Sequence, residues 1–245
     1  MLWLVVPVVA GGALAHAEPR DPVVPGGALD VSLSVETDLS LRKRFDVVSA
    51  APDLRWGVTD HLTLGLTHSM AGRSVIDSGG GLCSGCDEPY SNVFFDLSYN
   101  IHDRAQLPAA GRLRLGASAI DPLTTVLSLG ATGRFGSRRM WIQLDPALQL
   151  GLNRTDQGNE NQWNLPLWVA VLVSRATVFV QTGIVAPAAA LGDEHRIPLG
   201  IGTMIEITPR WEVGAEIAFP RLLGPLNSER ARHGSVYVRY RLPAT

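Results

Sequence analysis

Apolar residues recur at every second position along most of the chain. In the C-terminal segment Val236, Val238, Tyr240 and Leu242 alternate with Ser235, Tyr237, Arg239 and Arg241. Residues 92–102 and 211–219 show the same two-residue period. Side chains of a strand alternate between its two faces, whereas a helix repeats its apolar face every three or four residues. The pattern therefore predicts an all-β chain whose strands each have an apolar face and a more polar face.

Turn-forming residues divide this pattern into twelve predicted strands. They cover residues 28–39, 45–57, 60–70, 91–101, 111–121, 124–135, 138–152, 162–174, 175–186, 195–207, 210–220 and 234–242. Short and long connections between these strands alternate along the chain. One set is mostly tight, as at 136–137 and 208–209, and the other set is mostly long, as at 71–90 and 221–233. Outer-membrane barrels have this alternation, with strands of about 9–11 residues. We predict a closed antiparallel transmembrane barrel over residues 28–242, an up-and-down meander of about 12 strands (range about 10–14).

Aromatic residues concentrate at the predicted strand ends. They are Trp56, Tyr99, Phe135, Trp211 and Tyr240 by the turns, and Trp163 and Phe219 by the loops. Two interfacial girdles of a membrane barrel produce this distribution. Four prolines, at positions 52, 146, 166 and 198, argue against a closed barrel because each removes a ladder hydrogen bond. They require bulges or rim positions, and a secreted β-sandwich, which has free edges, is the alternative.

Residues 28–242 as a whole resemble bacterial outer-membrane β-barrel proteins, by pattern rather than by a motif. Proteins of that superfamily end in a strand with alternating hydrophobics and a terminal aromatic. Tyr240-Arg241-Leu242 approximates this signal, although Pro243-Ala244-Thr245 follows and no final Phe is present. The resemblance implies the outer membrane of a Gram-negative bacterium, contact with its lipid and lipopolysaccharide, and insertion by the barrel assembly machinery. It implies no cofactor and leaves the oligomeric state open.

The first seventeen residues predict an export signal. Residues 2–14 are largely apolar, and Ala15-His16-Ala17 has the small-x-small pattern that signal peptidase cleaves. The run is short for a membrane helix of about 20 residues, and an uncleaved anchor is the alternative. Cleavage after Ala17 leaves residues 18–27 as an N-terminal periplasmic segment and residues 243–245 as a C-terminal tail.

Composition and charge exclude two classes of protein. A hydrophobic content of 46% excludes intrinsic disorder, and 21 basic against 23 acidic residues give no basic face for nucleic acid.

The charged residues on the more polar strand faces are Asp30, Asp53, Arg55, Asp96, Arg112, Arg114, Arg134, Asp145, Glu206, Glu212, Glu216, Arg239 and Arg241. In a barrel these residues line the lumen, with Asp96 beside the two arginines of the next strand, and Glu212 and Glu216 beside Arg239 and Arg241. Since buried charges require partners, they predict an ion-pair network; a selective constriction is the functional alternative.

Candidate reactive residues are few. Cys83 and Cys86 lie in the long connection 71–90, and in an exported protein their spacing favours a local disulfide over a metal or redox site. His68 and Ser69 are adjacent, so their side chains lie on opposite faces of a strand. Barrels that resemble the phospholipase A family carry a His and a Ser two positions apart, and this chain does not match them. We predict no catalytic residue and no metal site.

A barrel of about 12 strands encloses more space than one of eight and less than the wide channels of 16–18 strands. The sequence therefore predicts a narrow, porin-like channel for small solutes or ions. The first alternative is a non-conducting barrel with a structural or surface-binding role. The second is a barrel enzyme that modifies lipid or lipopolysaccharide.

Overall fold

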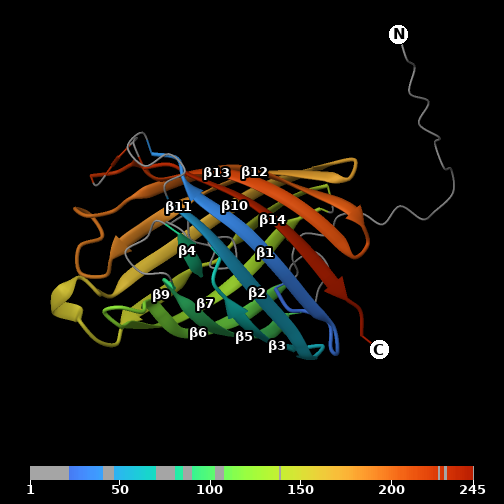
Figure 1. Cartoon of the computed structure of the whole chain (residues 1–245), viewed down its shortest axis with the longest axis horizontal. Helices are drawn as coiled ribbons and strands as arrows, with labels where there is room; N and C mark the ends of the chain where they lie inside the picture. The colour runs from blue at the N-terminus through green and yellow to red at the C-terminus, as the bar shows by residue number, and fades with distance from the viewer. Residues whose placement is uncertain are drawn as a thin grey trace, which may run out of the picture.

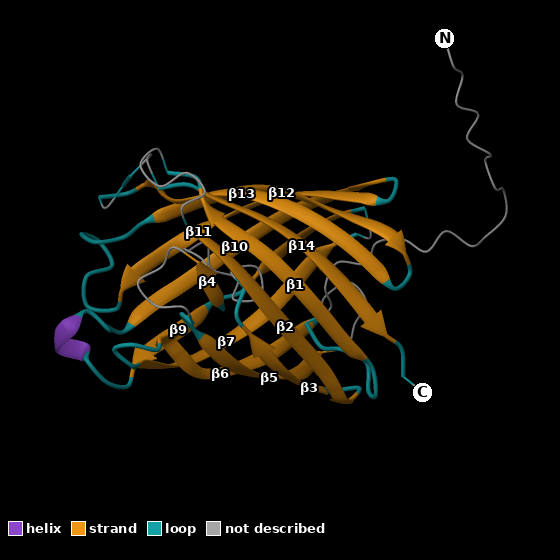
Figure 2. Ribbon diagram, in the orientation of Figure 1, coloured by secondary structure: helices purple, strands orange, loops and turns teal. Residues whose placement is uncertain are grey.

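The computed structural model describes residues 22–40, 47–69, 81–84, 90–102, 108–137, 139–225, 227–228 and 231–244, so the predicted signal peptide 1–17 lies outside the described residues. Figures 1 and 2 show a barrel of strongly tilted strands. The strands are β1 (Leu29–Asp38), β2 (Val48–Thr59), β3 (Leu62–Thr67), β4 (Leu82–Ser84), β5 (Val93–His102), β6 (Ala109–Ala119), β7 (Thr124–Gly136), β8 (Met140–Leu144), β9 (Ala147–Gly151), β10 (Gln162–Val173), β11 (Ala176–Pro187), β12 (Ile197–Thr208), β13 (Trp211–Leu223) and β14 (His233–Leu242). A 3-10 turn, η1 (Thr155–Gln157), lies between β9 and β10. No helix in the described ranges is long and apolar enough to cross a bilayer.

The first strand closes the barrel. β1 pairs with β14 from Leu29↔Leu242 to Asp38↔His233, and its other edge pairs with β2. β8 and β9 are two halves of one crossing, since both pair with β7 and with β10. β4 belongs to the connection between β3 and β5 and pairs with the first residues of β2. In the residues that the structure describes, the fourteen strand segments therefore make twelve crossings, all antiparallel, which confirms the predicted barrel.

The barrel is apolar outside and polar inside. On β1 the outward Leu33 and Val35 are 46% and 44% exposed, whereas Ser34 and Glu36 between them are 3% and 1% exposed. Buried polar or charged residues face inward on most other strands, and large exposed aliphatic residues cover the outside. A soluble sandwich buries its apolar faces, so this distribution excludes that alternative. It is the arrangement of a barrel whose outer surface meets lipid.

The two ends of the barrel differ. At one end tight turns join β2 to β3, β10 to β11 and β12 to β13, and the Leu29↔Leu242 pair places the start of β1 and the end of β14 there (Figure 1). At the other end longer connections join β9 to β10, β11 to β12 and β13 to β14 (Figure 2). Tight turns of outer-membrane barrels face the periplasm. We therefore call these ends the periplasmic end and the outer end.

The aromatic residues predicted to form girdles lie near strand ends. At the periplasmic end Trp56, Tyr99, Phe135 and Trp211 are 44–55% exposed. The Trp211 and Tyr240 rings contact each other at a tilt of 44°, with their centroids 4.5 Å apart. Trp163 and Phe219 lie toward the outer end, on β10 and β13. That these rings sit at the membrane interfaces stays a prediction.

The four prolines occupy interruptions in the strand ladder. Pro146 separates β8 from β9, and Pro198 lies at a register shift between β12 and β13. Pro52 and Pro166, in contrast, lie inside β2 and β10 without a bulge, so the expectation of bulges or rim positions is wrong for them. Pro52 falls between the parts of β2 that pair with β4 and with β3, and Pro166 faces the break between β8 and β9. Neither site requires the N–H group that proline lacks.

Candidate functional site: a two-part lumen

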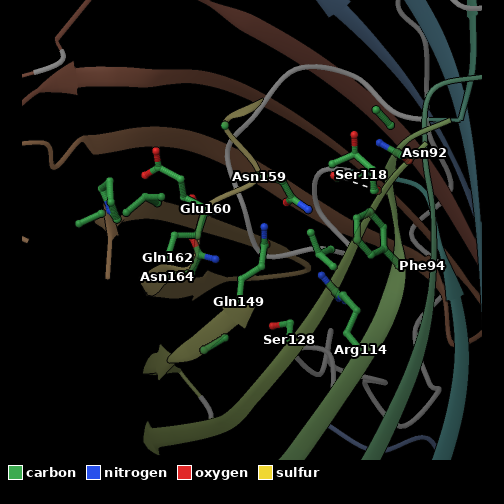
Figure 3. A pocket seen from close by; sticks show the side chains of 18 of the residues that line it. Asn92, Phe94, Arg114, Ser118, Ser128, Gln149, Asn159, Glu160, Gln162 and Asn164 are labelled. Carbon is green, nitrogen blue, oxygen red and sulfur yellow. Dashed lines mark hydrogen bonds between the residues drawn. The ribbon is translucent and has the colours of Figure 1, made fainter. Parts of the chain in front are cut away.

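The outer half of the lumen holds a cavity of about 860 Å³, which we call the vestibule (Figure 3). Strand register places five inward side chains in one row: Asp96 on β5, Arg114 on β6, Ser128 on β7, Gln149 on β9 and Gln162 on β10. The last four of them line the vestibule. The next row toward the periplasm carries Ser98, Arg112, Gly130, Ala147 and Asn164. The small residues in the middle of this second row, Gly130 and Ala147, also line the vestibule.

Three buried oxygen atoms on the vestibule wall have no hydrogen-bond partner in the described structure. They are the Oδ1 atoms of Asn92, Asp145 and Asn164, whose residues are 2%, 4% and 6% exposed. The other carboxylate oxygen of Asp145 accepts a hydrogen bond of 3.0 Å from the Gln143 amide. All three unsatisfied atoms are acceptors, so they suit a molecule that brings hydrogen-bond donors.

The charges around the vestibule are mixed. Its described lining holds the basic residues Arg112, Arg114, Arg154, Arg196 and Arg221, and the acidic residues Asp121, Asp145, Glu160 and Glu194. Arg114 is neutralised by Asp96, with Nε 2.5 Å from Oδ1. The vestibule therefore has no strong excess of either sign. Such a wall does not select for an ion of one charge.

Toward the periplasm the lumen narrows to a cavity of about 110 Å³. One side of this constriction is formed by Trp141, Trp168, Phe179, Met204 and Tyr237, which we call the aromatic wall. Two glycines make room for it: a Cβ atom on Gly202 would lie 2.4 Å from the Phe179 ring, and one on Gly214 would lie 2.3 Å from the Tyr237 ring. This wall was not predicted, because aromatic residues were expected only at the membrane interfaces. The signal that could have indicated the wall is the presence of apolar residues on both faces of β10 and β11.

Ion pairs cross the strands around the constriction. Asp96 contacts Arg114 and, at 4.0 Å, Arg112. Arg239 Nη2 donates to Glu212 at 2.7 Å, and the Tyr237 hydroxyl donates to the same carboxylate at 3.2 Å. These pairs join the residues that the strand order placed side by side.

Arg241 has a different partner from the predicted one. It was expected beside Glu212 and Glu216, but its guanidinium forms two hydrogen bonds to Asp30, of 2.7 and 2.9 Å. The reason is closure, which places Asp30 on β1 directly opposite Arg241 on β14. Glu216 lies opposite Ser235 instead.

The remaining predicted lumen residues also face inward. Asp53 accepts hydrogen bonds from the Ser69 hydroxyl and from the backbone N–H groups of residues 68 and 69. Arg134 lies over the Trp141 ring, with its Cζ 5.8 Å from the ring centroid. Glu206 is opposite Glu212 near the periplasmic end, and its neighbours Ile205 and Ile207 are exposed on the outside. Arg112 borders both the vestibule and the constriction.

The segment before β1 folds back into the periplasmic mouth, and we call residues 22–27 the strap. The Val24 N–H donates to Thr63 Oγ1 at 2.7 Å, and Arg55 Nη2 donates to the Pro22 carbonyl at 2.8 Å. Val24 is 1% exposed, and Pro22 borders the constriction. A Cβ atom on Gly57 would lie only 2.0 Å from the Pro25 carbonyl oxygen, so this glycine is what admits the strap. This contact could not be predicted from the residues alone, because the strap has no strand period.

His68 and Ser69 do not form a nucleophile and base. The ring nitrogens of His68 contact the Pro52 carbonyl at 2.5 Å and the Tyr90 hydroxyl at 2.7 Å, whereas the Ser69 hydroxyl donates to Asp53. A catalytic pair requires the base to accept the proton of the nucleophile. Cys83 is disulfide-bonded, and Cys86 lies outside the described residues, so their pairing stays a prediction.

Comparison with known proteins shows the fold class. No protein-family model and no curated protein sequence matches the chain. Among solved structures, the KdgM porin in complex with disordered oligogalacturonate matches with a TM-score of 0.58 and 9% identity, over 86% of this chain and 98% of that one. The COG4313 outer membrane channel from Pseudomonas putida F1 matches with a TM-score of 0.56 and 12% identity, over 93% of this chain and 100% of that one. The chain therefore has the fold of small outer-membrane porins and channels.

Proposed function

We propose that this protein is a narrow outer-membrane channel for small polar solutes. The observation that carries the proposal is the polar lining of the lumen: a vestibule of about 860 Å³ and, toward the periplasm, a constriction of about 110 Å³ both border Arg112. The lining of both cavities includes amide, hydroxyl and charged side chains, which favour water and polar solutes over lipid. Resemblance in fold to proteins described as porins and channels supports the same function.

A specific observation favours the alternative of a non-conducting barrel. The aromatic wall and the strap occupy much of the periplasmic half of the lumen. If they close it, the vestibule is a surface pocket rather than an entrance. The enzymatic alternative has no such support, since both His68 ring nitrogens are engaged by groups other than Ser69.

Reversing the charge of Arg112 tests the channel at a residue that both cavities share. In a potassium chloride gradient across a planar bilayer, Arg112→Glu is expected to raise the cation-to-anion permeability ratio several-fold, because it changes the local charge by about two units where ions must pass. Arg139→Glu is the matched control, since Arg139 is exposed in the turn between β7 and β8. Equal reversal potentials for Arg112→Glu and the wild type would show that ions do not pass this point.

A further inference from the structure

We propose that the vestibule is a binding site for uncharged oligosaccharides. The inference rests on the proposed function and names the class of solute. A volume of about 860 Å³ lies in the range of about 300–1,000 Å³ of small-molecule sites. It holds far more than the about 30 Å³ that one water molecule occupies.

The unsatisfied acceptors specify a ligand rich in donors. Asn92, Asp145 and Asn164 each bury an Oδ1 atom without a partner, and a buried acceptor left unsatisfied is costly. These residues come from different parts of the wall: Asn92 precedes β5, Asp145 follows β8, and Asn164 lies on β10. A ligand with several hydroxyl groups supplies donors to separate acceptors at once. A small anion supplies none.

The row of polar side chains on the outer side of Asp145 and Asn164 both donates and accepts hydrogen bonds. Ser128, Gln149 and Gln162 are adjacent across β7, β9 and β10, and all three line the vestibule (Figure 3). Hydroxyl and carboxamide groups offer donors and acceptors together, as sugar hydroxyls do. Successive sugar units therefore find matching groups along the row.

The charges favour a neutral ligand over a charged one. Acidic and basic side chains are mixed around the vestibule, and Arg114 is already paired with Asp96. Asp145 lies at the end of β8 beside Gln143, and an acidic sugar placed against it would be repelled. A cationic ligand would meet the same opposition from Arg112 on β6.

Isothermal titration calorimetry of the folded protein tests this assignment. The detergent must carry no sugar headgroup, for which lauryldimethylamine oxide is suitable, and the probes are maltotriose, trigalacturonate and trilysine. Maltotriose is expected to bind saturably and more tightly than either charged trimer. Gln149→Leu and Asn164→Leu are each expected to weaken it about 3- to 10-fold, the effect of one lost hydrogen bond.

Gln181→Leu is the matched control. Gln181 is buried inside the barrel on β11 and borders neither cavity, so its replacement is expected to leave maltotriose binding unchanged. A shift in mobility on boiling in SDS shows which variants are folded. No saturable binding of maltotriose, tighter binding of a charged trimer, or equal effects of the vestibule and control variants would each overturn the inference.

The titration needs no current, so it separates the two proposals. A protein that conducts but binds no maltotriose loses only the assignment of the solute. A protein that binds maltotriose but does not conduct keeps the binding site and loses the channel.

Discussion

A variant that lacks residues 22–26 is expected to conduct several-fold better than the wild type in single-channel recordings. The strap lies against the β2–β3 side of the periplasmic mouth, held by hydrogen bonds from Val24 to Thr63 and from Arg55 to Pro22. The aromatic wall contributes the large apolar residues of the same constriction. Removing the strap widens the narrowest part of the path, which limits the current.

A point variant repeats the test without shortening the chain. Gly57→Ala places a methyl group 2.0 Å from the Pro25 carbonyl oxygen, so the strap has to leave its position and the conductance should rise. Gly111→Ala is the control, because a Cβ atom there has only Ile101 Cδ1 nearby, at 3.4 Å. If the deletion and Gly57→Ala both fold and conduct like the wild type, the strap does not limit the passage.

Replacing Glu212 by leucine is expected to lower the free energy of unfolding by about 3–5 kcal/mol, because it removes one member of a buried ion pair. Glu212 and Arg239 are 6% and 8% exposed, and the Tyr237 hydroxyl also donates to Glu212. Unfolding in urea from lipid vesicles, followed by tryptophan fluorescence, measures the change.

Two further variants identify the cause of that change. Asp193→Leu removes an exposed acidic residue from the connection between β11 and β12 and is expected to change stability by no more than about 0.5 kcal/mol. The double variant Glu212→Leu, Arg239→Leu should recover most of the loss, since an apolar pair replaces a buried ion pair at little cost. A double variant as unstable as Glu212→Leu would show that the charge left on Arg239 is not the reason.

The architecture was predictable because a membrane barrel has a strict two-residue period. Leu33 and Val35 alternate with Ser34 and Glu36, and this local pattern assigns both faces without knowledge of the neighbouring strands. The Glu212–Arg239 pair was predictable for a similar reason, since β13 and β14 are consecutive and joined in antiparallel order.

Features that depend on distant parts of the chain were not predictable. Arg241 bonds to Asp30 because closure joins the first strand to the last, and a prediction built on consecutive strands placed it beside Glu212 and Glu216. The strap depends on the missing side chain of Gly57, a contact between a segment without periodicity and a single strand position. Phe179 points inward because Gly202 leaves room for its ring, which neither residue reveals alone.

The conductance of the wild-type protein in a planar lipid bilayer tests the central claim most directly. Folded protein is recognised by a change in its mobility in SDS on boiling. Such protein is predicted to insert into the bilayer and to raise the current in small, discrete steps. Both ions of the salt are predicted to carry this current. Folded protein that produces no current at any voltage would contradict the account and establish a closed barrel with a surface pocket.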